Sequence, residues 1–182
     1  MDPTSGVPLS EKLAAADEAE VAAALREHGD VGPAARLARA LVAAARAGQL
    51  TTTRRLAELA GRVLGDARPK ALAPVFQALR IWTNDEMADL EAALAWLPGA
   101  MREGGVVVTL SYHSGEDRRV KHALRGAPRV VPSRRLPVTD DGEAAGPWEE
   151  LTRKVVVPSS EEQQSNPRAR SARLRAFRRK PR

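Results

Sequence analysis

Apolar residues recur at helical spacing through the first part of the chain. The pattern predicts three helices, and each is bounded by residues that favour helix ends. They run from the N-cap candidate Ser10 to about His28, from Pro33 to about Ala47, and from the threonines at 51–53 to just before Gly65. A longer helical pattern covers residues 75–96, with an interruption predicted at Asn84. Two prolines make 68–74 a predicted link, and Pro98 with Gly99 is predicted to end the helix.

From Gly104 onwards the pattern changes. Residues 106–110 are apolar and mostly β-branched, which is typical of a strand covered on both faces. Residues 115–124 favour a helix, and 126–147 are predicted to be a mobile loop rich in Pro, Gly and charge. The remaining elements predicted are a strand at 154–157, a helical turn at 159–164, a strand at 172–179 and a disordered tail at 179–182. The sequence therefore predicts a helix-rich α/β fold.

Composition excludes several kinds of site. The chain has no Cys and three His, so disulfides and thiolate chemistry are excluded, and we expect no metal site. No apolar run is long enough to span a bilayer, and the first ten residues lack a basic stretch followed by an apolar one. We expect a soluble, cytoplasmic protein.

The net charge of +6 is unevenly distributed. Residues 1–117 carry a net charge of −4 and residues 118–182 a net charge of +10, with 24 Arg but only 5 Lys in the whole chain. Because Arg binds phosphate in a bidentate manner, this distribution favours a polyanionic partner for the second part. A GC-rich genome, which raises both Arg and Ala, is the alternative explanation.

A polar cluster follows the predicted strand 106–110. It contains Ser111, His113, Ser114, Glu116 and Asp117. Ligands of open α/β sheets bind beyond the carboxyl ends of strands, so this cluster is a candidate for chemistry. The alternative is that Ser114, Glu116 and Asp117 cap the next helix, while His113 satisfies nearby backbone groups.

Arginines alternate near the end of the chain, at 168, 170, 173 and 175. On an extended backbone 168 and 170 would share a face, as would 173 and 175, and their guanidinium groups could follow a phosphate backbone. A solvated charge run is the alternative. Phe177 is the only aromatic residue nearby, so stacking on bases has little support.

Three segments, in order and spacing, resemble the MraW-type S-adenosylmethionine-dependent 16S rRNA cytosine-N4 methyltransferases. They span residues 76–87 (FQALRIWTNDEM), 104–121 (from Gly104-Gly105 through SYHSGEDRRVK) and 166–175 (NPRARSARLR), and the block up to Gly61 looks like the helical insert of that family. The resemblance implies an incomplete class I methyltransferase Rossmann-like sheet of about three strands with an all-helical inserted domain. Residues 1–72 would be the substrate-recognition insert and 73–182 the C-terminal part of the sheet domain.

The resemblance also implies an activity, the transfer of a methyl group from S-adenosylmethionine to the N4 amine of a cytosine in the decoding region of the small subunit. The lone pair of that amine is conjugated with the ring, so a site must position it, and Ser111 and His113 are the candidate catalytic residues. The partner would be 16S rRNA in the small ribosomal subunit. The expected RNA contacts are Arg118, Lys121, Asn166, Arg168, Arg170 and Arg173.

Family members carry their cofactor-binding residues ahead of the position that matches Met1. We therefore expect no cofactor-binding residue here, no S-adenosylmethionine binding by this chain alone, and a truncated or mis-started enzyme. A non-catalytic RNA- or ribosome-binding module is the alternative. The strand at 106–110 would have a bare edge that could pair with a second copy or a complementing chain. Gly115 and Pro33 depart from the family pattern, and we expect each to loosen or redirect a helix.

Overall fold

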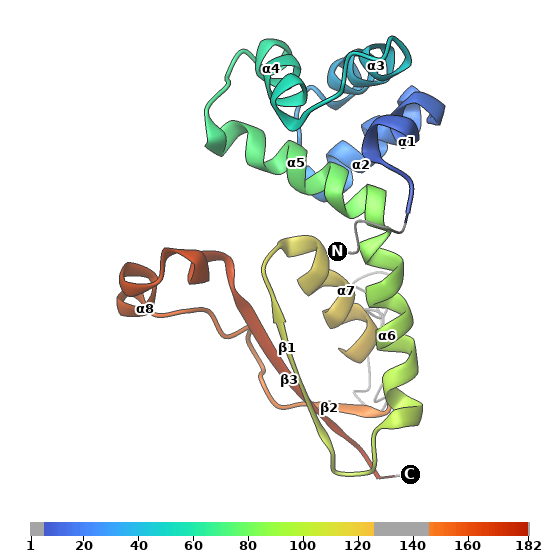
Figure 1. The fold of residues 1–182 in the computed structure, drawn as a ribbon. Coiled ribbons are helices and arrows are strands. Elements are labelled where there is room, and N and C mark those ends of the chain that lie inside the picture. The colour runs from blue at the N-terminus through green and yellow to red at the C-terminus, as the bar shows by residue number, and fades with distance from the viewer. Residues whose placement is uncertain (1–5, 126–145, 182) are drawn as a thin grey trace, which may run out of the picture. The chain divides into compact units, whose positions relative to one another are not determined.

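The computed structural model describes residues 6–125 and 146–181 (Figure 1). The chain forms two compact units, Met1–Glu86 and Met87–Arg182. This division falls later than the boundary expected at residue 72, because the helix that follows residue 68 packs against the helices before it. The first unit contains α1 (Leu9–Ala15), α2 (Glu18–Gly29), α3 (Ala34–Arg46), α4 (Thr53–Leu64) and α5 (Pro69–Asn84).

The core of the first unit is built from small and aliphatic side chains. Leu13, Leu25, Leu37, Leu41 and Val75 are fully buried, and alanines of α3 and α5 fill the space between them. The helix predicted at about 53–64 is confirmed with both of its boundaries. The hydroxyl of Thr52 accepts a hydrogen bond from the backbone N–H of Arg55, and Gly65 takes the left-handed conformation, φ 71°, that ends the helix.

The single helix predicted from Ser10 to His28 is wrong, because the backbone is extended at Ala16 and Asp17 and separates α1 from α2. Arg46 stabilises this break by donating to the carbonyl oxygens of Ala14 and Ala16, at 3.1 and 3.0 Å. Leu13 and Val21 both reach the core as a result.

Two predicted proline breaks are also wrong. Pro69 begins α5, the position where a missing N–H costs nothing, and Pro74 lies inside the helix. Pro98 lies inside α6 (Glu86–Ala100), so the helix continues past it. The interruption expected at Asn84 is found one residue later, at Asp85, whose φ of 53° ends α5.

The second unit holds a small sheet with helices on one face. Its elements after α6 are β1 (Val106–Ser111), α7 (Ser114–Arg125), β2 (Trp148–Glu150), α8 (Ser160–Ser165), the 3₁₀ helix η1 (Pro167–Ser171) and β3 (Arg173–Arg179). The strand order is β1-β3-β2 with antiparallel pairings, which confirms the expected α/β class with about three strands. Leu94 of α6 and Leu124 of α7 pack with Trp148 and Phe177 to form the core.

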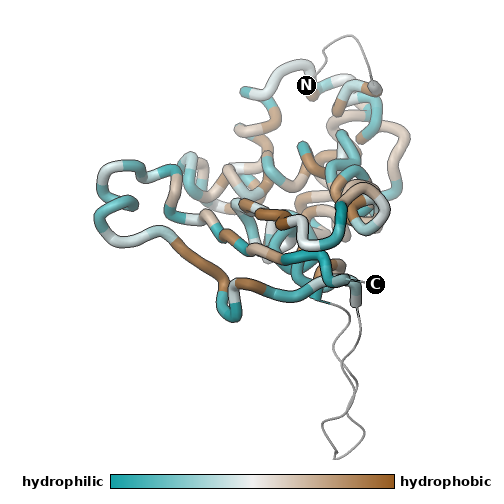
Figure 2. The backbone as a smooth tube through the Cα atoms, turned by 90° about the horizontal axis from the view of Figure 1, so that it is seen from below, coloured by the Kyte–Doolittle hydropathy of each residue, from teal (hydrophilic) through white to brown (hydrophobic). Residues whose placement is uncertain are grey.

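The expectation that the first strand is covered on both faces is not met within the described residues. Val107 packs towards the helices, but Val106, Val108 and Leu110 on the other face are 47, 58 and 54% exposed. Figure 2 shows hydrophobic backbone, in brown, on the strands and where the chain enters the α8 arm. Val156 and Val157, in the latter stretch, are also exposed.

Two predictions near the end of the chain are corrected. The strand expected at 154–157 is only an isolated bridge between Val156 and Leu174, while Trp148–Glu150 forms the strand that the sequence pattern missed. The disordered tail was expected to begin at residue 179. Arg179 instead is the last residue of β3, and only 8% of its surface is exposed. Lys180 donates its backbone N–H to the carbonyl of Pro147 at 2.9 Å. Residues 126–145 of the predicted loop, and Arg182, lie outside the described residues.

Within residues 6–125 and 146–181, no helix combines the length and the hydropathy that crossing a bilayer requires. Pro33 and Gly115 do not prevent helix formation. Pro33 occupies the N-cap position of α3, and Gly115 lies in the first turn of α7, where the backbone N–H groups have no intrahelical partner in any case.

Candidate functional site

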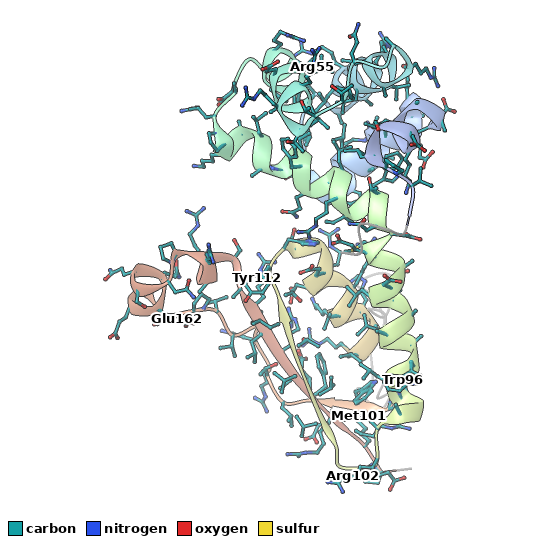
Figure 3. The ribbon with its side chains drawn as sticks, viewed as in Figure 1. Arg55, Trp96, Met101, Arg102, Tyr112 and Glu162 are labelled. Atoms are coloured by element: carbon teal, nitrogen blue, oxygen red, sulfur yellow. The ribbon has the colours of Figure 1, made fainter. Side chains whose placement is uncertain are left out.

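The sheet register brings two distant segments to one end of the second unit. Ser111, the last residue of β1, pairs with Arg173, the first residue of β3. The turn at 112–113 and the start of α7 therefore lie beside the exit of η1, although the two segments are 50 to 60 residues apart in the sequence. In Figure 3 Tyr112 marks this end of β1, and Glu162 lies on the neighbouring arm formed by α8 and η1.

His113 is the N-cap residue of α7. Its Nδ1 accepts a hydrogen bond from the backbone N–H of Glu116 at 3.3 Å, and its Nε2 lies 3.1 Å from Oε1 of the same residue. The other carboxylate oxygen of Glu116 accepts from the backbone N–H of Tyr112 at 2.9 Å. These contacts match the helix-capping alternative given by the sequence. Nδ1 is used by the cap, whereas the buried Nε2, although 3.1 Å from Glu116, has no hydrogen-bond partner among the described residues.

Gly115 is explained by the position of the His113 ring. A Cβ at residue 115 would stand 3.1 Å from Nδ1 and 3.2 Å from Cε1 of that ring. Glycine therefore lets the imidazole lie close against the first turn of α7. Ser111, the other candidate catalytic residue, is buried, with 4% of its surface exposed.

A buried ion pair anchors α7 to the sheet. The guanidinium of Arg175 binds the carboxylate of Asp117 through two hydrogen bonds, Nε to Oδ1 at 2.7 Å and Nη2 to Oδ2 at 3.1 Å. These hydrogen bonds hold the pKa of Asp117 below its usual value, with smaller contributions from the charges of Arg173 and Lys121. The same pairing raises the pKa of Arg175.

Glu150 extends this ion pair into a network. Its Oε1 lies 3.4 Å from Nη1 of Arg175, and its Oε2 lies 2.8 Å from Nε of Arg125. Sequence reasoning placed Arg175 on a phosphate-binding face and missed this network. The signal was available in the strand alternation, because residues 173, 175, 177 and 179 share a face and Phe177 is apolar.

The basic residues predicted to bind RNA are partly accessible. Arg118, on α7, and Arg168 and Arg170, on η1, are exposed, while Lys121 is half-buried. Arg173 keeps 40% of its side chain exposed and lies 3.9 Å from Asp117. Arg168 and Arg170 belong to a 3₁₀ turn, so the extended backbone on which they would share a face is not present there. Asn166 caps that turn by accepting the backbone N–H of Arg168 at 3.3 Å.

Tyr112 is the accessible aromatic residue at this end of the sheet. It is 54% exposed, and its backbone N–H is held by Glu116. Phe177, the aromatic that the sequence reasoning considered for stacking, is fully buried in the core. The signal that could have identified Tyr112 is its place directly after the last strand residue.

The glycine pair 104–105 is not a cofactor-binding turn, because it precedes β1 and its backbone is used by the sheet. Gly104 donates to the carbonyl of Arg179 at 2.9 Å, and the N–H of Arg179 donates to Gly105 at 2.8 Å. Within the two described ranges, no three His, Asp or Glu side chains are placed to hold a metal ion.

Comparison with known proteins shows a consistent relationship. Residues 1–180 match the model of the MraW methylase family. Proteins named Ribosomal RNA small subunit methyltransferase H are similar to the chain. The one from Gemmatimonas aurantiaca is 40% identical over 98% of this chain and 57% of its own length. Those from Anaeromyxobacter sp. (strain K) and Methylibium petroleiphilum are 43% and 39% identical, over 94% and 96% of this chain. The chain spans about half the length of these relatives.

Proposed function

The chain belongs to the MraW methylase family, and we propose that it forms part of a cytoplasmic enzyme. This enzyme methylates the N4 amine of a cytosine in 16S rRNA, in the small ribosomal subunit. S-adenosylmethionine is the methyl donor in this proposal. The observation that carries it is the Ser111–Arg173 register, which joins the turn after β1 to the arm that presents Arg168 and Arg170. We assign donor binding to none of the described residues, and we propose roles for them only towards the target amine and the rRNA.

We assign rRNA binding to the arm and to the outer surface of α7. Arg118, Arg168 and Arg170 are exposed guanidinium groups suited to phosphate oxygens. Lys121 and Arg173 are less available to bind phosphate, since the charges of both also stabilise the carboxylate of Asp117. Asn166 acts by positioning, because its Oδ1 holds the turn that presents Arg168.

His113 and Ser111 remain the proposed residues at the target amine. The Nδ1 of His113 caps α7 by accepting from the backbone N–H of Glu116, so we propose that His113 positions the turn carrying Tyr112 instead of transferring a proton. Ser111 is buried at the end of β1, so its hydroxyl would contact a substrate only from within this buried position.

The second candidate function is a non-catalytic RNA- or ribosome-binding module. The observation that favours it is the cap in which Nδ1 of His113 accepts from Glu116, since a helix cap requires no catalysis. The exposed arginines serve this function equally well. A measurement of methyl transfer separates the two candidates.

We also propose that β1 pairs with a further polypeptide strand, from a second copy or a complementing chain. Within the described residues, β1 pairs only with β3, and its other edge has unpaired backbone groups.

A chimera tests the proposed function. The portion of the Gemmatimonas relative that this chain does not match would be fused to the chain, and methyl transfer from labelled S-adenosylmethionine to unmethylated small subunits would be measured. We expect methylated cytosine, and we expect H113A to lower transfer. A chimera that folds and binds S-adenosylmethionine but methylates no cytosine would contradict the enzyme and favour the binding module.

A further inference from the structure

The arm formed by α8 and η1 contains a concavity of about 510 Å³. Its lining residues are Ser160, Gln163 and Gln164 from α8, and Pro167, Arg170 and Ser171 from η1. The arm extends from the sheet in Figure 1. A concavity of this size falls within the range of small-ligand sites in proteins.

The lining has one charge, and it is positive. Arg170 supplies a guanidinium group, the two serines supply hydroxyl groups, and the two glutamines supply amides that both donate and accept. The carboxylates of Glu161 and Glu162 are on the same helix but do not line the concavity. No aromatic side chain lines it, so a base has no surface on which to stack.

One glutamine amide is already oriented. Nε2 of Gln163 donates to the carbonyl oxygen of Pro158 at 3.0 Å, and this bond leaves Oε1 of this lining residue available as an acceptor. An acceptor of this kind suits a hydroxyl donor. The guanidinium of Arg170, on the facing turn, suits a phosphate.

We propose that this concavity binds one ribose–phosphate unit of RNA, with the phosphate on Arg170 and the ribose 2′-hydroxyl on the amides of Gln163 and Gln164. This inference rests on the proposed binding of rRNA by the arm and names what the arm recognises. Because the 2′-hydroxyl is the group that separates RNA from DNA, the concavity discriminates the sugar and tolerates any base.

Fluorescence anisotropy with three labelled single strands of one sequence tests the inference. The probes are RNA, the same RNA with 2′-O-methyl groups, and DNA. We expect the full chain to bind RNA about 5- to 10-fold more tightly than the other two strands, the size of effect expected from one or two hydrogen bonds. The double variant Q163A/Q164A should lower RNA affinity to that of DNA while leaving DNA affinity unchanged.

Arginine variants provide the matched controls. R170A should weaken binding of all three probes, whereas R168A, on the same turn but outside the concavity, should leave the RNA-to-DNA ratio intact. Because Gln163 also holds the arm, Q164A alone is the variant that keeps the backbone contact to Pro158. Equal affinity for RNA and DNA in the wild-type chain, or an unchanged ratio in both glutamine variants, would overturn the sugar recognition alone. An absence of binding to every probe would overturn the proposed rRNA interface as well.

Discussion

At the scale of single residues, Asp117 joins the proposed site to the sheet. Its carboxylate accepts two hydrogen bonds from Arg175, and it lies one residue after Glu116, which holds Tyr112 and His113. Loss of the carboxylate would leave a buried guanidinium without its main counter-charge. The position of the turn after β1 therefore depends on a pair that the sequence analysis did not identify.

We expect D117N to lower the free energy of unfolding by about 3 kcal/mol, because one partner of a buried pair is removed. Urea denaturation followed by circular dichroism measures this change. The matched control is D89N on the exposed surface of α6, expected within about 0.5 kcal/mol of wild type. Equal stability of D117N and D89N would show that the pair contributes nothing.

The pH dependence of stability follows from the lowered pKa of Asp117. A carboxylate with a lowered folded-state pKa contributes stability above its unfolded value of about 3.9, and that contribution is lost as the pH falls through the folded-state value. Wild type should therefore lose this contribution below about pH 4. In denaturation series from pH 7 to pH 2, the gap between wild type and D117N should narrow at the acid end; a constant gap would argue against the assignment.

Tyr112 offers a test of base stacking at the same site. We expect Y112A to weaken binding of single-stranded RNA by about 1 kcal/mol or more, while Y112F, which keeps the ring, binds like wild type. Because stacking releases no counterions, the salt dependence should be the same for all three proteins. Anisotropy titrations at several salt concentrations measure both quantities, and unchanged affinity in Y112A would exclude the stacking role.

At the scale of elements, helix α2 ends in close contact with α5. A Cβ added at Gly29 would stand 2.5 Å from the carbonyl oxygen of Pro74, which is backbone and cannot rotate away. Pro74, which was predicted to belong to a link between helices, thus lies inside α5 at the place where α2 approaches α5.

We expect G29A to destabilise the first unit by about 2 kcal/mol through this overlap. G32A is the control, since a Cβ there meets nothing within 4 Å and its φ is not positive. Thermal unfolding followed at 222 nm compares the two. If G29A proves as stable as G32A, the contact between α2 and α5 is not as close as described.

The uncovered face of β1 predicts self-association. Val108 is 58% exposed beside Val106 and Leu110, and V108K should place a charge in this apolar surface and reduce association. V7K is a matched control, because Val7 is also 58% exposed but lies in the first unit. Sedimentation velocity should show a shift towards monomer for V108K only; a monomeric wild-type chain would refute self-association through β1.

The accuracy of the sequence predictions depended on how local each signal is. Thr52 and Gly65 mark α4 correctly because capping involves only neighbouring residues. The break at Ala16 depends on Arg46, thirty residues away. The strand β2 has only three residues, too few for an alternation of apolar and polar residues to predict it. In the candidate site, the cap at His113 could be predicted from Glu116, but the Asp117–Arg175 pair required the strand register.

At the scale of the whole molecule, the excess of positive charge lies in the second unit. Residues 1–86 carry 11 basic and 11 acidic side chains and are neutral, residues 87–117 carry a net charge of −4, and residues 118–182, which include the arm and most of α7, carry +10. Burial removes some of this charge from solvent, because Arg175 and Arg179 are less than 9% exposed. Arg118 on α7 and Arg168 and Arg170 on η1 stay exposed and can meet a phosphate backbone.

The salt dependence of RNA binding tests the central claim most directly. Anisotropy titrations of the full chain with a single-stranded fragment of small-subunit rRNA would be carried out from low to physiological salt. Each phosphate contact to a single strand contributes about −0.7 to the slope of log K against log salt, so the exposed arginines predict a slope of about −2. The double variant R168A/R170A should bring the slope to about −0.7. A wild-type slope near zero, or one that the double variant leaves unchanged, would contradict the assignment of this end of the molecule to rRNA.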